Sequence, residues 1–351
     1  MEKNVVVLGA GVIGLTTATL LLKQEKGVKV HIIASIFPND PEALSNEYTS
    51  ATAGAHWRGY EQNDPRQQEF EKSTYNYLWE LANKNMSNVT GVMVIDEYNY
   101  WEKRPDDFGP WFRTVCHEFK ELEKNELPDD IEFGIKYKSI SINPLTYLNY
   151  LLSTFIFLGG TTEHVKIKHL DGCVRENTDI LINCSGYGAK TLEGVKDINL
   201  YPVRGQSVIM QLSQSCLDWA CFRHSYNGDY ALETFIIPRE NGEVMLGGTR
   251  EKDNDSTEIE HSVAQKIIQR CFATRPDFLK DTKVQLTLKG HRVGLRPYRN
   301  GGIRVEAELR NCGKSSKEII VCHNYGHAGV GYQTSYATAQ LAIDLIKKKI
   351  K

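Results

Sequence analysis

The sequence predicts an α/β fold in which a domain built on a parallel sheet is interleaved with a domain built on a mixed β-sheet. Three observations support this prediction. The chain opens with a strand–turn–helix–strand pattern, continues through a long β-rich section, and ends in a helix. Its 351 residues exceed the roughly 250–300 residues at which a single hydrophobic core stops growing, so we expect two domains.

The opening unit consists of a strand at residues 4–8, a glycine-rich turn at 9–14, a helix at 12–23 and a strand at 28–34. Further on, apolar residues at helical spacing predict helices, and short apolar runs bounded by turn residues predict strands. The expected helices are 66–83, 145–157, 258–271 and 333–349, and the expected strands are 180–188 (ending in a glycine turn), 207–212, 234–237, 244–247, 285–288, 303–306 and 318–323. The aromatic and acidic stretch 98–132 shows no regular pattern.

The turn after the first strand carries the first chemical signal. Gly9, Gly11 and Gly14 form a GxGxxG pattern that leads into a helix. The first glycine permits a tight turn, the second lets the backbone approach a pyrophosphate, and the third allows close helix–strand packing. The pyrophosphate then lies at the helix N-terminus, where N–H groups and the helix dipole favour an anion. The context indicates a Rossmann-like dinucleotide-binding domain, with a plain glycine turn as the alternative.

The end of the second strand departs from the usual dinucleotide pattern. That position normally carries Asp or Glu, whose carboxylate binds the ribose 2′-hydroxyl. Here Ala34 ends the strand and Ser35 follows, with a single hydroxyl to offer. The missing carboxylate argues against a plain NAD site and leaves the ribose contact open.

Composition and charge exclude several classes of partner. The 42 Lys and Arg residues nearly balance the 44 Asp and Glu residues, so the net charge of −2 gives no reason to expect nucleic acid. No apolar run reaches the roughly 18 residues of a membrane span, and the N-terminus lacks the shape of a signal peptide. The eight cysteines lack CxxC spacing, which predicts reduced thiols in an intracellular protein and no metal site.

Eight short motifs follow one another along the chain: residues 5–15 (VVVLGAGVIGL), 49–57 (TSATAGAHW), 183–188 (NCSGYG), 201–206 (YPVRGQ), 235–239 (FIIPR), 247–250 (GGTR), 294–306 (GLRPYRNGGIRVE) and 323–333 (HNYGHAGVGYQ). With these motifs in this order, nearly the whole chain resembles the D-amino-acid oxidase and D-aspartate oxidase family of flavoproteins. Among them, the GGTR motif is most similar to that of the D-aspartate oxidases.

The resemblance implies noncovalent FAD and oxidation of a D-amino acid to an imino acid, which hydrolyses to a 2-oxo acid and ammonia while O₂ becomes hydrogen peroxide. It implies an FAD-binding domain at residues 1–60, 137–200 and 290–351 and a substrate-binding domain at 61–136 and 201–289. The family is often peroxisomal, but the chain ends in a lysine-rich segment instead of Ser-Lys-Leu, so a cytoplasmic location stays open. A monomer and a homo-oligomer both stay open as well.

The resemblance also assigns cofactor contacts. They are the glycine turn, two polar residues after the second strand, the backbone beside the flavin ring, a second glycine turn, and a loop that leads into the last helix. The residues are Gly9, Gly11, Val12, Ile13, Gly14, Ser35, Thr49, Ser50, Gly54, Ala55, Val165, Ser185, Ala328, Gly329, Val330, Gly331, Tyr332 and Gln333. The last helix would direct its positive end at the reduced flavin.

The substrate contacts combine the resemblance with the chemistry of carboxylates. Arg296 matches the arginine that binds the α-carboxylate, since the guanidinium fork accepts a carboxylate bidentately. Arg250 would pair with a second, side-chain carboxylate and so favour acidic substrates such as D-aspartate; a strand-end arginine in solvent is the alternative. Phe235 stands where the family commonly has a tyrosine. The remaining candidates are His56, Gly329 and Tyr230 (with Tyr226), and Arg223 and Arg58 are weaker ones.

The chemistry itself needs no catalytic side chain, because the α-hydrogen can pass to the flavin as hydride. His323 and His327 are therefore expected to have structural roles. Three other functions stay open: oxidation of neutral D-amino acids, oxidation of glycine or sarcosine by a related flavoenzyme, and a flavin-binding module without turnover.

Overall fold

The computed structural model describes residues 3–59, 62–213, 217–224, 232–275, 285–312, 315 and 317–350. The chain divides into two compact units, each described here by itself. The first comprises Met1–Ala53, Leu145–Val203 and Leu295–Lys351, and the second comprises Gly54–Pro144 and Arg204–Gly294. One unit holds a largely parallel sheet and the other a mixed sheet, so the predicted α/β fold class is confirmed.

The boundaries of the units differ from the predicted ones because of strand pairing. The segment after Ala53 pairs with a strand of the second unit: the carbonyl of Ala55 accepts from the N–H of Ile142, and the N–H of Trp57 donates to the carbonyl of Ile140. Two more junctions lie inside the long strands β8 (Leu200–Leu212) and β13 (Leu286–Arg299), of which the sequence pattern showed only a part. The fourth junction follows Pro144, at the start of α5 (Pro144–Phe157).

The first unit is built on a six-stranded sheet with the order β14-β15-β7-β1-β2-β6. Its strands are β1 (Lys3–Leu8), β2 (Val28–Ala34), β6 (Thr161–His164), β7 (Ile180–Asn183), β14 (Arg304–Arg310) and β15 (Ile319–Tyr325). All neighbours are parallel except β14, which runs antiparallel to β15. The carboxyl ends of β1, β2, β7 and β15 therefore share one edge, the edge where open α/β sheets bind ligands.

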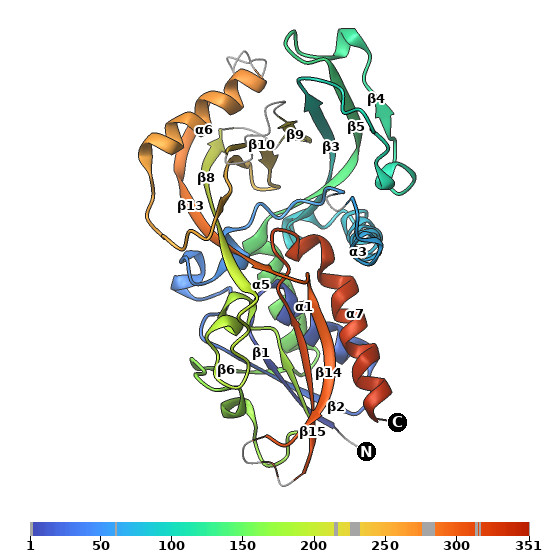
Figure 1. Cartoon of the computed structure of the whole chain (residues 1–351), viewed down its shortest axis with the longest axis vertical. Coiled ribbons are helices and arrows are strands. Elements are labelled where there is room, and N and C mark those ends of the chain that lie inside the picture. The colour runs from blue at the N-terminus through green and yellow to red at the C-terminus, as the bar shows by residue number, and fades with distance from the viewer. Residues whose placement is uncertain are drawn as a thin grey trace. The chain divides into compact units, whose positions relative to one another are not determined.

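Helices α1 (Val12–Gln24), α5 (Pro144–Phe157) and α7 (Gly331–Ile350) complete the first unit. Figure 1 shows α7 running alongside β14 and β15, and it also packs on α1. The opposite face of the sheet packs on Leu170, Cys173 and Val174. Because both faces are covered, the central strands β7 and β15 are buried at every position and largely apolar, as parallel strands usually are.

The second unit is built on a mixed sheet with the order β12-β8-β11-β10-β9-β3-β5-β4, in which β13 also pairs with β8. Its further strands are β3 (Val92–Trp101), β4 (Lys120–Glu121), β5 (Phe133–Ile142), β9 (Trp219–His224), β10 (Leu232–Pro238), β11 (Glu243–Thr249) and β12 (Glu251–Lys252). Helix α3 (Pro65–Ala82) packs on β3 and β5, and α6 (His261–Thr274) packs on β10 and β11. The short helices of the chain are α2 (Thr49–Thr52), α4 (Ser87–Thr90) and the 3₁₀ turns Pro41–Leu44, Trp111–Thr114, Lys124–Glu126, Leu170–Cys173 and Gly186–Lys190.

The expectation of an irregular stretch at 98–132 is wrong at its start. Strand β3 runs to Trp101 and pairs antiparallel with β5 over its whole length, from Val92–Ile142 to Trp101–Phe133. The pattern was obscured because β3 buries the polar residues Glu97 and Asn99. In the described part of the chain, no helix has the length and apolar character that crossing a membrane requires.

Candidate functional site

The glycine-rich turn between β1 and α1 has no room for side chains. Gly9 has a φ of +106°, and a Cβ there would lie 2.5 Å from the carbonyl oxygen of Cys184. A Cβ on Gly14 would lie 1.9 Å from the carbonyl oxygen of Gly9, and one on Gly11 would lie 2.8 Å from Ser50 Oγ. The three glycines thus hold the start of α1 against its neighbours, where the first N–H groups of a helix lack helical partners.

Ser50 joins this turn to the start of α7. Its Oγ accepts from the N–H of Val12 at 3.0 Å, and its carbonyl oxygen accepts from the hydroxyl of Tyr332 at 2.9 Å. The neighbouring Thr49 instead donates its hydroxyl to the carbonyl of Leu295 at 3.3 Å. Of the two polar residues expected near the phosphates, Ser50 therefore touches the turn directly, whereas the hydroxyl proton of Thr49 is used within the protein.

Ser185 follows β7 at the same edge of the sheet. Its N–H donates to Asn183 Oδ1 at 3.2 Å, and Gly186 beside it has a φ of +56°. Among the described residues, the buried Oγ of Ser185 has no hydrogen-bond partner. Buried hydroxyls are rarely left unpaired, so this one fits a polar group that the protein itself does not supply.

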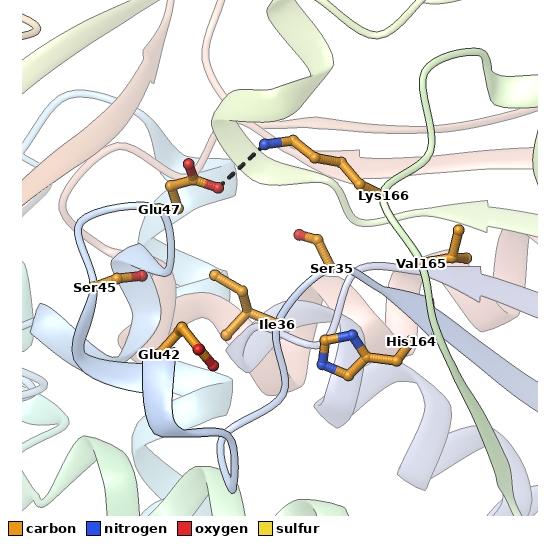
Figure 2. A pocket seen from close by; sticks show the side chains of 8 residues that line it. All are labelled: Ser35, Ile36, Glu42, Ser45, Glu47, His164, Val165 and Lys166. Atoms are coloured by element: carbon orange, nitrogen blue, oxygen red, sulfur yellow. Dashed lines mark hydrogen bonds and ion pairs between the residues drawn. The ribbon is translucent and has the colours of Figure 1, made fainter.

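A pocket of about 480 Å³ opens beyond the end of β2 (Figure 2). It contains both predicted residues of this region, Ser35 and Val165, and the N–H of Val165 donates to the carbonyl of Ala34 at 2.9 Å. The other lining residues are Ile36, Glu42, Ser45, Glu47, His164 and Lys166. The position beside the end of β2 is where a Rossmann-like domain holds the nucleoside of its dinucleotide.

The polar groups of this pocket suit a ribose. The buried Oγ of Ser45 has no partner within the described part of the chain. Glu42 and Glu47 bring carboxylates to the pocket from the segment after β2, and Figure 2 shows Glu47 paired with Lys166 at 3.2 Å. Carboxylates thus line the pocket although the strand end carries none. Together with the glycine turn and Ser185, the pocket fits an extended dinucleotide such as FAD.

The loop before α7 lies against the predicted carboxylate-binding arginine. The N–H of Ala328 donates to the carbonyl of Pro297 at 3.0 Å, and Ala328 has a φ of +48°, unusual for a residue with a side chain. A Cβ on Gly329 would lie 3.5 Å from Arg296 Cδ and 3.8 Å from the hydroxyl of Tyr298. Arg296 and Gly329, both expected to contact substrate, are therefore neighbours within the first unit. The rest of the predicted loop, Val330, Gly331, Tyr332 and Gln333, leads into and begins α7.

The two histidines of this region are buried and contact other side chains of the first unit. Burial lowers the pKa of His323 to about 4 and that of His327 to about 3. His323 Nδ1 lies 3.1 Å from Asn183 Nδ2, and His327 Nε2 lies 3.2 Å from Thr338 Oγ1. Both rings are thus held within hydrogen-bonded contacts, as expected for structural residues.

In the second unit, three stacked rings connect two of the predicted substrate residues. Phe235 is buried, and its ring centroid lies 5.3 Å from that of Phe222, which lies 5.2 Å from that of His56. The guanidinium of Arg58 lies 4.2 Å over Phe222. Ala55 precedes His56 with a φ of +53°, and Gly54 has Ile237 and Met245 as neighbours. His56 Nε2 is 2.8 Å from Glu97 Oε2, so one ring nitrogen already has a protein partner.

The predicted arginines of this unit are held by carboxylates to different degrees. Arg250 forms an ion pair with Glu233 at 3.6 Å, and each of these side chains is about one quarter exposed. Arg223 pairs at 2.8 Å with both Glu102 and Asp130, which leaves it less suited to bind a substrate. Tyr226 and Tyr230 lie outside the described residues.

Sequence reasoning missed several residues that the structure places at these sites. Ser45, Glu42, Glu47 and Lys166 line the nucleoside pocket, and Glu97 contacts His56. The only sequence signal for the pocket was the missing acidic residue after β2, which implied that other groups must serve. No signal pointed to Glu97, because its partner is 41 residues away in the chain.

Known proteins are similar to this chain along nearly its whole length. Residues 4–345 match the family model described as FAD dependent oxidoreductase. A D-amino-acid oxidase of Schizosaccharomyces pombe is 31% identical over 355 residues, covering 99% of this chain and 97% of that protein. A D-aspartate oxidase of Cryptococcus neoformans is also 31% identical, over 394 residues, with 99% and 97% covered.

Solved structures are similar in fold. The glycine oxidase of Geobacillus kaustophilus has a TM-score of 0.76 at 16% identity and covers 99% of this chain and 95% of its own. The glycine oxidase of Bacillus cereus has a TM-score of 0.75 at 17% identity, with 99% and 98% covered. The family match spans almost the whole chain, and the geometry of the glycine turn fits the cofactor of that family. The chain therefore belongs to the family of FAD-dependent oxidoreductases, and FAD is its cofactor.

Proposed function

We propose that this protein oxidises D-amino acids and prefers acidic ones such as D-aspartate. Bound FAD would supply the redox chemistry: an acceptor for the α-hydrogen as hydride, and a route for the two electrons to O₂, which would become hydrogen peroxide. The substrate leaves as an imino acid, which water converts to a 2-oxo acid and ammonia. Similarity to both a D-amino-acid oxidase and a D-aspartate oxidase supports the reaction but does not choose between neutral and acidic substrates.

Arg296 is the proposed partner of the α-carboxylate. Its stem lies against Gly329, where the absence of a side chain leaves space beside the guanidinium. A planar guanidinium binds a carboxylate through two parallel N–H bonds, which fixes orientation as well as position. Holding the α-carbon at near-attack distance is the main task of the protein, because the cofactor supplies the chemistry. No side chain is needed as a base.

Arg250 is the single observation that carries the acidic preference. It follows directly after β11 in the GGTR motif, and its side chain is about three quarters buried and pairs with Glu233. A cation in such a position attracts the side-chain carboxylate of D-aspartate, and a substrate without that carboxylate gains nothing from it. Phe235 is apolar and buried, so it offers contact area and no hydrogen bond.

Oxidation of neutral D-amino acids is the second candidate, and the Arg250–Glu233 ion pair favours it. An arginine that already has a carboxylate partner does not require one from the substrate. The two candidates differ in the result of one comparison, that of D-aspartate with D-asparagine. These substrates have nearly the same shape and differ in one negative charge.

The test measures hydrogen peroxide formed by the FAD-loaded protein from D-aspartate, D-asparagine and D-alanine, for the wild type and for Arg250→Met. A hydrogen bond to a charged group contributes about 1.5–3 kcal/mol, so the variant should lose roughly 10- to 150-fold in kcat/KM for D-aspartate. Its kcat/KM for D-asparagine should stay within a few-fold. Arg292→Met, which removes another arginine of the second unit, is the matched control. A wild type that prefers D-asparagine would refute the acidic preference and leave the oxidase assignment standing.

A further inference from the structure

Arg204 is a charged side chain with no exposed surface inside the second unit. It lies on β8, within the motif 201–206 (YPVRGQ), to which neither the cofactor contacts nor the substrate contacts give a role. A buried guanidinium is costly unless acceptors compensate its charge and its five N–H groups. The partners of Arg204 therefore show which part of the second unit it holds in place.

Arg204 binds the segment that directly follows Arg250, residues 251–260. Its guanidinium meets two carboxylates and two backbone carbonyls of this segment. They are Glu251 Oε1 at 2.7 Å, Glu260 Oε1 at 3.5 Å, the carbonyl of Ser256 at 3.0 Å and the carbonyl of Glu258. One buried side chain thus holds the segment against β8 at both of its ends and in its middle.

Gln206 adds a second set of contacts from the same face of β8. Residues two apart on a strand point to one face, and Arg204 Nη2 donates to Gln206 Oε1 at 3.0 Å. The same oxygen accepts from the N–H of Glu260 at 2.9 Å, and Gln206 Nε2 donates to the carbonyl of Glu260 at 2.8 Å. The side-chain amide therefore pairs with the backbone of Glu260 as a neighbouring strand would.

These contacts anchor the chain on both sides of Arg250. Arg250 fills the one-residue gap between β11, which ends at Thr249, and β12, which begins at Glu251, and both strands pair with β8. Before the gap, Thr249 Oγ1 accepts from the N–H of Gln206 at 2.9 Å. After the gap, Arg204 holds the carboxylate of Glu251. The backbone from which the Arg250 side chain extends is therefore fixed at both neighbouring residues.

The placement of this backbone decides what the guanidinium of Arg250 can reach. Two parallel N–H bonds to a carboxylate require a correct distance and a correct orientation. A misplacement of about 1 Å in a site of this kind can lower the rate roughly 100-fold. Arg250 also pairs with Glu233 at 3.6 Å, so a substrate carboxylate has to meet the guanidinium from the side that Glu233 leaves open. A fixed backbone limits the positions that the long side chain can take.

We propose that Arg204 is a positioning residue for the recognition of acidic substrates, and that it acts by fixing the backbone of Arg250 through Glu251 and Gln206. The inference rests on the proposed acidic preference and deepens it. Arg204 acts through Arg250 and not on the substrate, because its own guanidinium is buried among partners of the protein. A neutral substrate gains nothing from Arg250, so its oxidation should not depend on this network.

The test measures hydrogen peroxide formed from D-aspartate and D-asparagine by the FAD-loaded protein, for the wild type, Arg204→Lys, Arg250→Met and the double variant. Lysine keeps the charge but replaces the planar fork by one ammonium group, so the long-range field stays the same. For Arg204→Lys, we expect kcat/KM for D-aspartate to fall about tenfold, mainly through KM, and kcat/KM for D-asparagine to stay within about twofold. In the Arg250→Met background, Arg204→Lys should not lower the ratio of the two kcat/KM values further, because residues that act as a unit are not additive.

Arg239→Lys is the matched control. Arg239 is also buried in the second unit and pairs with Glu243 at 3.1 Å, but it lies beside the start of β11, whereas Arg250 follows the end of that strand. This control should leave the ratio of D-aspartate to D-asparagine unchanged. Gln206→Met removes an acceptor of Arg204 without changing any charge, and it should lower the ratio about threefold. It decides the matter if Arg204→Lys does not fold.

The outcomes separate this inference from the proposed function. If Arg250→Met lowers the ratio while Arg204→Lys affects both substrates equally, or neither, Arg204 is only structural and the acidic preference stands. If Arg204→Lys lowers the ratio by the same factor with and without Arg250, the two residues act independently and the inference is also wrong. If the wild type does not prefer D-aspartate, or if Arg250→Met leaves the ratio unchanged, the acidic preference fails and this inference fails with it.

Discussion

The substitution Gly14→Ala tests whether close packing in the glycine turn is what creates the FAD site. An alanine Cβ would lie 1.9 Å from the carbonyl oxygen of Gly9 and 2.9 Å from its carbonyl carbon, whereas ordinary contact begins at 3.4 Å. Both atoms belong to the backbone, so no flexible side chain can move aside. Either the turn or the start of α1 must shift by about 1.5 Å to restore contact.

A shift of that size would displace the N–H groups of the first turn of α1, which would bind the pyrophosphate of FAD. A hydrogen bond to a charged group contributes about 1.5–3 kcal/mol, and we expect the loss of roughly two of them. We therefore expect FAD affinity to fall by roughly 10²- to 10⁴-fold, taking about 1.4 kcal/mol per factor of ten. The second unit does not contain this turn and should keep its secondary structure.

The assay is FAD binding to the apoprotein, followed by the quenching of flavin fluorescence, together with thermal unfolding of the apoprotein. Gly172→Ala is the matched control in the same unit, because a Cβ there would meet only methyl groups of Ile167 at 3.7 Å. An affinity of Gly14→Ala within threefold of the wild type, with an unchanged melting temperature, would refute the packing argument.

Two further predictions concern the nucleoside pocket and acid stability. Ser45→Ala should weaken FAD binding about 5- to 10-fold, the equivalent of one hydrogen bond, because Ser45 Oγ is buried in that pocket without a described partner. The substitution should weaken the binding of AMP, measured by competition with FAD, by the same factor. An unchanged AMP affinity would contradict the placement of the ribose. Burial lowers the pKa of His224 and of His327 to about 3, so their stabilising effect is complete above the unfolded pKa of about 6.5 and is lost as pH falls toward 3. Urea unfolding should show about 2 kcal/mol of lost stability per histidine between pH 8 and 5, and His327→Gln should remove its share of that loss.

The first unit could be predicted from sequence because its signals are local. Gly9, Gly11 and Gly14 indicate the turn, and the flanking strand and helix contain runs of apolar residues. The central parallel strands β1 and β7 end in runs of apolar residues because both faces of the sheet are covered there. Only Ser35 and Val165 of the pocket beyond β2 were predicted, because the walls of this pocket come from two separate segments, residues 35–47 and 164–166.

The second unit was harder to predict because its polar residues are inside. Strand β3 carries Glu97 and Asn99 where alternation requires apolar residues, so the stretch looked irregular. These two residues are buried only because His56 and His224 supply hydrogen-bond partners from distant positions in the chain. A rule based on neighbouring residues has no access to such partners, and places where local rules fail are often functional.

Within the second unit, Arg250 and His56, the two candidates for binding an acidic side chain, already have carboxylate partners. These partners limit how strongly the enzyme can select acidic over neutral substrates. Arg250 has Glu233 at 3.6 Å, and His56 has Glu97 at 2.8 Å. A neutral substrate therefore leaves no unpaired buried charge, and the large penalty that such a charge would impose is absent. An acidic substrate must instead compete with Glu233 for Arg250. Discrimination between D-aspartate and D-asparagine should then be of the order of tens to hundreds, well below the roughly 10⁴–10⁵ reached where a mismatched substrate leaves buried polar groups unpaired.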